Sequence, residues 1–159
     1  MNRRHFLKGT LAVALMSRGM TAIASAVSEA NYEITRTEVE WRTLLTDFEY
    51  QVMREEATER AYSSPLNDEK RTGLFHCKGC ELPLYDSATK FDSGTGWPSF
   101  YDSLPNAVST KDDRSWFVTR TEVHCRRCGS HMGHIFEDGP KPTGLRHCIN
   151  GVAMTFHPN

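Results

Sequence analysis

The chain has 159 residues, of which 38% are hydrophobic, 25% charged and 10% aromatic, a composition typical of a globular protein. Its formal net charge of -1 provides no basic field to attract nucleic acid or an anionic membrane, so we expect no nucleic-acid partner. No apolar run reaches the roughly 18 residues of a membrane-spanning helix, so we expect no membrane anchor once any leader is cleaved. A chain of this length is expected to form one domain.

Residues 1–26 have the pattern of an export signal. Arg3 and Arg4 precede Phe-Leu-Lys, an apolar stretch follows, and small residues close the segment. This order is typical of a cleavable signal peptide, and the arginine pair resembles a twin-arginine signal, so we expect export to a bacterial periplasm. Cleavage after Ala24 or Ala26 would leave a domain of residues 27–159, with 15 basic and 20 acidic side chains. An amphipathic first helix of the fold is the alternative.

The remaining chain begins with helical signals and continues with strand signals. Residues 37–40 and 46–49 each carry Thr three positions before Glu, the capping-box pattern that predicts two short helices. The apolar residues expected on the core-facing side of these helices are Trp41, Leu44, Leu45, Phe48 and Val52. After Gly73, short runs are divided by Gly, Pro, Asp and Ser, with strand-like segments at 116–123 and 152–156 and a loop at 63–67. The pattern predicts a mainly β domain with antiparallel strands.

Four of the five cysteines form two C-x-x-C pairs, Cys77 with Cys80 and Cys125 with Cys128, separated by 44 residues. Two such pairs can close one tetrahedral site for a structural Zn²⁺ and so join two distant hairpins. Two disulfides are the alternative in an exported protein, and a redox dithiol is another. We favour zinc because the intervening residues are polar, no βαβ pattern is present, and a twin-arginine substrate folds in a reducing cytosol.

Cys148 is the remaining cysteine, and its neighbours are polar. Arg146, Cys148 and Asn150 alternate along a strand-like run, which predicts that they share one face. A guanidinium beside a thiol favours the thiolate, and an amide adds a donor and an acceptor. The pattern indicates a nucleophile; an inert buried cysteine is the alternative.

Two histidines, His131 and His134, stand three positions apart. The H-E-x-x-H metalloprotease pattern needs a spacing of four and an intervening Glu, so it does not apply. Hydrogen bonding and proton transfer in a pocket are expected of this pair; purely structural histidines, or a second metal held with Asp138, are the alternatives. The turn-rich loop 92–100 displays Trp97 but lacks the Lys-[Ser/Thr] of a phosphate-binding loop.

Taken in order, these motifs resemble the type B methionine-R-sulfoxide reductases over residues 32–157. The matching segments are 58–60, the two C-x-x-C pairs, 90–100, 131–136, 138–140, 143–144 and 146–150. The resemblance implies two twisted antiparallel sheets with short N-terminal helices and one structural Zn²⁺ on the four paired cysteines. It also implies repair of one epimer of methionine sulfoxide.

The resemblance further implies a mechanism centred on Cys148. The thiolate would attack the sulfur of the R-sulfoxide, release methionine and remain as a sulfenic acid. His134, together with His131, would hold the sulfoxide oxygen and assist its protonation.

Four more residues match the family's substrate pocket. Asn150 would complete a polar wall, and Arg146, paired with Asp138, would favour the thiolate. Trp97 would pack against the substrate methyl group. Methyl and oxygen could not then exchange places, which would explain why only the R epimer is accepted.

One position departs from the family. Many members carry a resolving cysteine between the two glycines of the Ser-Gly-x-Gly-Trp loop, where this chain has Thr95. We therefore expect an external thiol reductant, either thioredoxin-like, glutaredoxin-like or a small thiol, acting on a monomer whose substrates are oxidised proteins or peptides. An exported zinc-ribbon binding module without catalysis and a thiol-disulfide carrier are the alternative functions.

Overall fold

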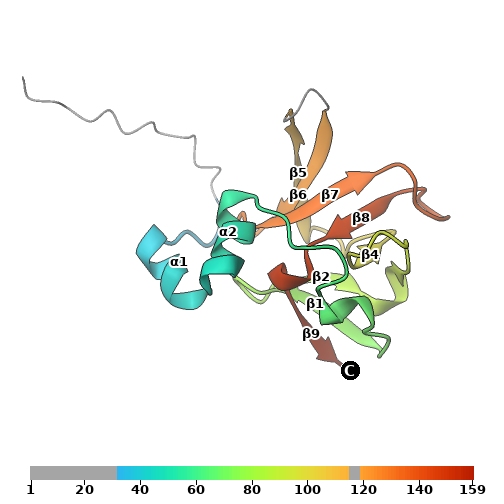
Figure 1. The fold of residues 1–159 in the computed structure, drawn as a ribbon, viewed down its shortest axis with the longest axis horizontal. Helices are drawn as coiled ribbons and strands as arrows, with labels where there is room; N and C mark the ends of the chain where they lie inside the picture. The colour runs from blue at the N-terminus through green and yellow to red at the C-terminus, as the bar shows by residue number, and fades with distance from the viewer. Residues whose placement is uncertain (1–31, 115–118) are drawn as a thin grey trace, which may run out of the picture.

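A computed structural model of the protein describes residues 32–114 and 119–159. The expected export signal at 1–26 and part of the expected strand, 116–118, lie outside these residues. Within them, two antiparallel sheets stand beside a pair of short helices (Figure 1). The helices of the described part are too short and too polar to cross a membrane.

The two helices begin where the capping boxes predict them. They are α1 (Glu38–Leu44) and α2 (Asp47–Glu55). In α1 the Thr37 side chain accepts a hydrogen bond from the Glu40 amide, and the Glu40 carboxylate accepts one from the Thr37 amide. Thr46 and Glu49 repeat this exchange in α2, so both predicted helices are confirmed.

The expected core face of this helical pair is only partly right. Trp41, Leu45 and Val52 are buried, but Leu44 and Phe48 expose 57% and 46% of their surface. The reason is the break between the helices, because Leu45 (φ -114°, ψ 145°) and Thr46 have extended backbone. The spacing of one continuous helix therefore does not hold across this point.

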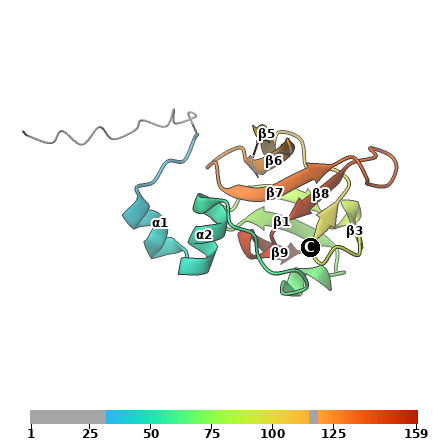
Figure 2. The same ribbon diagram turned by 45° about the horizontal axis from the view of Figure 1, so that its top comes forward.

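All paired strands are antiparallel, as predicted. The smaller sheet has the order β2 (Pro83–Asp86), β1 (Gly73–Cys77), β9 (Met154–Pro158). The larger has the order β3 (Lys90–Phe91), β4 (Ser99–Phe100), β8 (Arg146–Ile149), β7 (His131–Phe136), β6 (Arg120–Cys125), β5 (Val108–Asp113). In Figure 2, β7 and β8 of the larger sheet lie over β1 and β9 of the smaller one.

Within the described residues, three single-turn 3₁₀ helices lie in the connections: η1 (Pro65–Asn67), η2 (Ser87–Thr89) and η4 (Gly151–Ala153). The turn η1 falls in the expected loop. The strand expected to begin at residue 152 begins instead at Met154, because the turn η4 precedes it.

An aromatic cluster fills the space between the sheets. The ring of Phe100 in β4 lies 5.0 Å from that of Phe75 in β1 and 4.3 Å from that of Tyr85 in β2, measured between centroids. All three side chains are completely buried. Because they come from both sheets, their burial holds the layers together.

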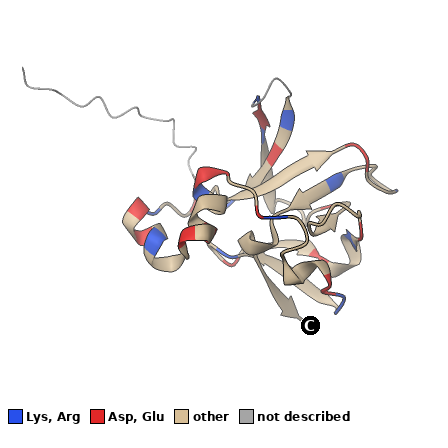
Figure 3. Cartoon of the chain, in the orientation of Figure 1, with Lys and Arg blue, Asp and Glu red and all other residues tan. Residues whose placement is uncertain are grey.

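The helices cover the turns that carry the C-x-x-C pairs. The Trp41 ring lies between the guanidinium groups of Arg36 and Arg54, each 4.7 Å from its centroid. Arg36 donates a hydrogen bond to the Gly79 carbonyl, and Arg54 donates one to the Cys128 carbonyl. The helical pair is thereby tied to both turns. Figure 3 shows acidic and basic residues interspersed over this face of the molecule.

Candidate active site

Cys148 opens into a cavity of about 160 Å³ between the strands of the larger sheet and the Trp97 loop. Its lining residues are Thr58, Trp97, Arg120, Gly133, His134, Phe136, Cys148 and Asn150. Across the sheet, Cys148 of β8 stands opposite His134 of β7 and opposite Ser99 of β4. Four residues predicted from the sequence therefore share one cavity.

The floor of this cavity requires a glycine at position 133. A Cβ atom added to Gly133 would lie 2.0 Å from the carbonyl oxygen of Cys148. No side chain fits there, so glycine allows β7 to run directly against the strand that carries the thiol.

Arg146 and Asp138 form the expected ion pair beside Cys148. Arg146 Nε and Nη2 lie 2.8 and 2.9 Å from the two carboxylate oxygens of Asp138, and the guanidinium also covers the Phe136 ring. Arg146 and Cys148 alternate on β8, so their side chains share a face as predicted.

Opposing effects act on the pKa of Cys148, and Arg146 lowers it as expected. Burial raises the pKa of Cys148, and this effect outweighs the lowering by the Arg146 charge and by the Thr95 hydroxyl. The sequence showed the nearby cation but not the desolvation of the sulfur, which disfavours the charged form.

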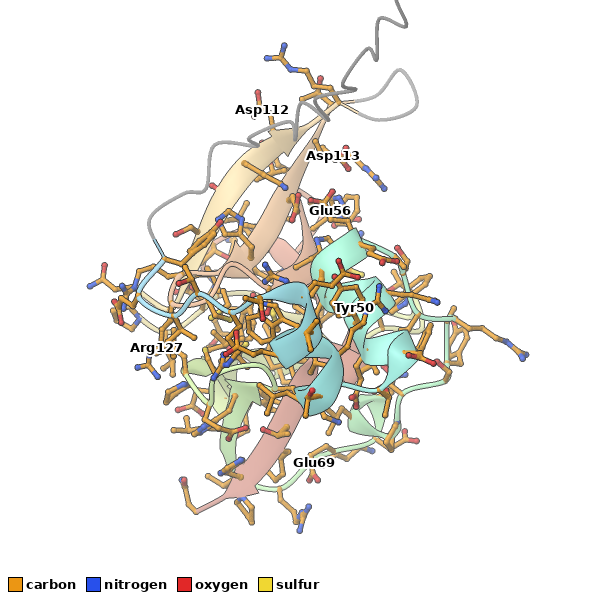
Figure 4. The ribbon with its side chains drawn as sticks, turned by 90° about the vertical axis from the view of Figure 1, so that its left-hand side faces the viewer. Tyr50, Glu56, Glu69, Asp112, Asp113 and Arg127 are labelled. Carbon is orange, nitrogen blue, oxygen red and sulfur yellow. The ribbon has the colours of Figure 1, made fainter. Side chains whose placement is uncertain are left out.

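His134 is held by a carboxylate that the sequence did not reveal. Its Nε2 atom lies 2.9 Å from Asp113 Oδ2, and the same oxygen accepts hydrogen bonds from Arg120. Burial lowers the pKa of His134, while the hydrogen bond to Asp113 opposes that effect. Figure 4 labels Asp113 on the β5–β6 hairpin, with Glu56 on the side of the helices. Asp113 of β5 and Arg120 of β6 stand opposite each other across the hairpin.

His131 lies behind His134 rather than in the Cys148 cavity. The register of β6 against β7 shifts at this point, since Val123 pairs with Gly133 whereas His124 pairs with His131. The bulge brings the His131 and His134 rings to 5.5 Å between centroids.

The ring of His131 is buried and held by a carboxylate. Its Nδ1 atom lies 2.8 Å from the buried carboxylate of Glu122, which also pairs with Lys111. Its Nε2 atom is buried without a hydrogen-bond partner among the described residues. His134 lines the Cys148 cavity, and both histidines line a neighbouring cavity that shares Thr58 and Arg120 with it. The contact of both histidines with one substrate oxygen stays a prediction.

Glu59 is a buried residue of the site to which the sequence gave no role. Its carbonyl accepts a hydrogen bond from Trp97 Nε1 at 3.0 Å, and its amide donates to Asn150 Oδ1 at 3.0 Å. Its carboxylate accepts hydrogen bonds from the amides of Gly151 and Val152. Glu59 thus fixes two walls of the cavity.

Asn150 lies just beyond the end of β8, which stops at Ile149. Its backbone is still extended (φ -64°, ψ 115°), and it lines the same cavity as Cys148. Its side-chain amide is already engaged, because Nδ2 donates to the Met132 carbonyl and Oδ1 accepts from Glu59. Asn150 lines the cavity as part of its frame.

The four paired cysteines converge from the two sheets. Their sulfur atoms all lie within 4.8 Å of one another, with Cys77 and Cys128 3.7 Å apart and Cys80 and Cys125 3.5 Å apart. Four sulfurs bound to one Zn²⁺ at about 2.3 Å stand about 3.8 Å apart, so the cluster fits such an ion. All five cysteines are free thiols, which disfavours the two-disulfide alternative.

The second metal site considered for the histidines is not formed. His131, His134 and Asp138 do not cluster as ligands within the described ranges 32–114 and 119–159. Each is engaged elsewhere, with Glu122, Asp113 and Arg146 respectively.

Comparison with known proteins identifies relatives over most of the chain. Residues 45–158 match the family model described as the SelR domain. The peptide methionine sulfoxide reductase MsrB of Pseudomonas putida (strain W619) is 50% identical over 127 residues, which cover 79% of this chain and 96% of the relative. The protein of the same name from Methanosarcina barkeri is 49% identical over 128 residues, covering 80% of this chain and 90% of the relative. A third, from Alteromonas mediterranea, is 51% identical over 120 residues, covering 75% and 84%.

Proposed function

The chain belongs to the SelR domain family, and we propose that it is a peptide methionine sulfoxide reductase that converts the R epimer of methionine sulfoxide to methionine through Cys148. The observation that carries this proposal is the cavity in which the sulfur of Cys148, the imidazole of His134 and the indole of Trp97 meet. It combines a nucleophile, a proton-transfer group and an apolar wall.

In the proposed reaction, the Cys148 thiolate attacks the sulfoxide sulfur. A bond forms between the two sulfurs, the substrate sulfur–oxygen bond breaks, and the oxygen takes up two protons and leaves as water. A water molecule then attacks the Cys148 sulfur, the sulfur–sulfur bond breaks to release methionine, a proton is lost, and Cys148 is left as a sulfenic acid. His134 is placed to assist the proton transfer, since it stands directly opposite Cys148 on the neighbouring strand. Asp113 holds the ring of His134 in position.

Trp97 supports the choice of epimer. Its ring lines the cavity and is anchored through Nε1 to the Glu59 carbonyl. With the methyl group against this ring and the oxygen toward His134, the S epimer would place oxygen on an apolar surface. Only the R epimer can therefore place its methyl group on Trp97 and its oxygen toward His134 at the same time.

We assign one structural Zn²⁺ to Cys77, Cys80, Cys125 and Cys128, whose sulfur spacing suits a tetrahedral ion. A bound zinc ion would link the turn after β1 to the turn after β6. It would contribute stability and take no part in the reduction.

We assign the return of Cys148 to its thiol form to an external thiol. This thiol would attack the sulfenic acid, forming a mixed disulfide and water, and a second thiol would release Cys148 as the external disulfide forms. In the Trp97 loop, the Oγ1 atom of Thr95 lies 4.0 Å from the Cys148 sulfur, and a threonine cannot form a disulfide. Trapping a stable Cys148 sulfenate after sulfoxide treatment supports this route; a disulfide to one of the paired cysteines contradicts it.

We further propose that the protein is a monomer exported by the twin-arginine route to a bacterial periplasm, where oxidised proteins are its substrates. The arginine pair at Arg3 and Arg4 and the small residues before Ala24 and Ala26 support this proposal. Replacing both arginines with lysine should retain the protein in the cytosol. Unchanged export of that variant would contradict the proposed route.

The decisive experiment compares the R and S epimers of an N-blocked methionine sulfoxide, with dithiothreitol as reductant. We expect loss of the R epimer alone, and no loss with Cys148→Ser. If the metal-loaded protein consumes neither epimer, the catalytic proposal fails and a zinc-ribbon binding module takes its place.

A further inference from the structure

A chain of hydroxyl groups runs from Cys148 into the Trp97 loop. Thr95 Oγ1 lies 4.0 Å from Cys148 Sγ, and Ser93 Oγ lies 2.8 Å from Thr95 Oγ1. Ser93 Oγ is also 2.8 Å from Ser99 Oγ, which donates to the Trp97 carbonyl at 3.1 Å. Ser99 is completely buried, so the inner end of this chain is fixed in the sheet.

By rotation of its hydroxyl groups alone, this chain can accept a hydrogen bond from the Cys148 thiol or donate one to the thiolate. With a thiol, Cys148 donates to Thr95, Thr95 to Ser93, and Ser93 to Ser99. The Trp97 carbonyl then accepts the last hydrogen bond, so every hydroxyl is satisfied. With a thiolate, each hydroxyl turns the other way, and Thr95 donates to the sulfur.

Thr95 acts on Cys148 beside charged groups. Arg146 of β8 lowers the pKa of Cys148 through its charge and a hydrogen bond, and it also pairs with Asp138 in the connection after β7. His134 of β7 and Arg120 of β6 line the same cavity, and both are bonded to Asp113. Burial opposes the thiolate and raises the pKa of Cys148, while the Thr95 hydroxyl acts in the opposite direction.

We propose that Thr95 is a further catalytic residue of this site, which donates a hydrogen bond to the thiolate of Cys148, and that Ser93 and Ser99 position its hydroxyl. This inference rests on the proposed function of Cys148 as the nucleophile. Thr95 stands where many family members have a resolving cysteine, and the inference assigns it a role in the attack on the sulfoxide.

The test is the pH dependence of Cys148 alkylation by iodoacetamide in metal-loaded protein. Thr95→Val removes the hydroxyl and nearly keeps the shape of the side chain. We expect the apparent pKa of Cys148 to rise and alkylation at neutral pH to slow by about tenfold, because a hydrogen bond to a charged group is lost. Thr95→Ser, the matched control, should keep the wild-type pKa.

A second variant tests the chain behind Thr95. Ser93→Ala leaves the Thr95 hydroxyl in place but removes its fixed partner, so we expect a smaller rise in the same pKa. Circular dichroism and metal content check that each variant is folded. An unchanged alkylation pKa in Thr95→Val overturns the inference, even if the unmodified protein reduces the R-sulfoxide. Failure of the unmodified protein to reduce it overturns the proposed function instead.

Discussion

The buried carboxylate of Glu59 organises the cavity without lining it. Glu59 is only 4% exposed, and its carboxylate receives the amides of Gly151 and Val152. Its own backbone holds the Trp97 indole and the Asn150 amide. Removing the carboxylate takes the hydrogen-bond acceptor from the buried Gly151 amide and the partly buried Val152 amide. It also frees the segment that holds Trp97 and Asn150 in place.

We therefore predict that Glu59→Ala lowers the free energy of unfolding by about 2–4 kcal/mol and shifts tryptophan emission, since two buried hydrogen bonds and their frame are lost. Glu59→Gln, which keeps one acceptor oxygen, should lose less. Urea denaturation monitored by circular dichroism gives the energies. Wild-type stability in Glu59→Ala would show that the carboxylate does not hold this frame.

Residues of the site differ in how far the sequence could reveal them. The alternation of Arg146 and Cys148 is local, so it predicted their shared face correctly. Asp113 and Glu59 could not be found in this way, because their partners His134 and Asn150 lie 21 and 91 positions away. An acidic residue has no local pattern that announces a distant partner.

At the scale of elements, the bulge in β7 explains how two histidines three positions apart come together. Regular alternation would place them on opposite faces of the strand. The register shift between β6 and β7 restores them to one side. The H-x-x-H spacing predicted neither the bulge nor the burial of His131, because both depend on the neighbouring strand.

Gly133, next to this bulge, allows the close approach of β7 and β8. We predict that Gly133→Ala costs more than about 2 kcal/mol of stability and abolishes turnover, because its Cβ would overlap the Cys148 carbonyl. Gly144→Ala is the control: its Cβ meets no atom within 4 Å, and its positive φ should cost only about 1 kcal/mol. Equal losses in chemical denaturation would contradict this explanation.

His147 joins the two sheets and should make stability depend on pH. Its Nδ1 atom lies 3.2 Å from the Tyr85 hydroxyl of β2, and burial lowers its pKa. His147 therefore binds a proton more readily in the unfolded chain than in the folded protein. This contribution to stability is therefore present above an unfolded pKa of about 6.5 and is lost as pH falls.

When the pH is lowered from about 7.5 to about 5, we predict a smaller fall in the free energy of unfolding for His147→Gln than for wild type. Glutamine does not titrate, so the contribution of His147 to this fall is removed. Urea denaturation across this range measures the slope. His157→Gln, at a side chain 51% exposed, controls for the loss of an imidazole elsewhere. A wild-type slope in His147→Gln would exclude this histidine as a source of the pH dependence.

Across the described part of the molecule, the aromatic cluster and the pair of His147 with Tyr85 connect the sheets in the interior, and the four cysteines connect them at one end. Cys77 ends β1 of the smaller sheet, and Cys125 ends β6 of the larger one. The sequence predicted this connection from spacing alone, since two C-x-x-C turns suit one ion. It could not predict that Trp41, Arg36 and Arg54 pack the helices onto the same turns, because the helical spacing says nothing about the partner surface.

Removal of the metal should therefore loosen both sheets and the helices together. We predict about one zinc ion per chain, and a large fall in thermal stability on chelation, since structural zinc contributes on the order of 10 kcal/mol. Cys125→Ser should show the same loss, whereas Cys148→Ser should keep both metal and stability. Metal analysis and calorimetry measure these quantities. If the metal-free protein unfolds at an unchanged temperature, the interior contacts between the sheets are sufficient to hold them together, because the cysteines then contribute no connection that folding needs.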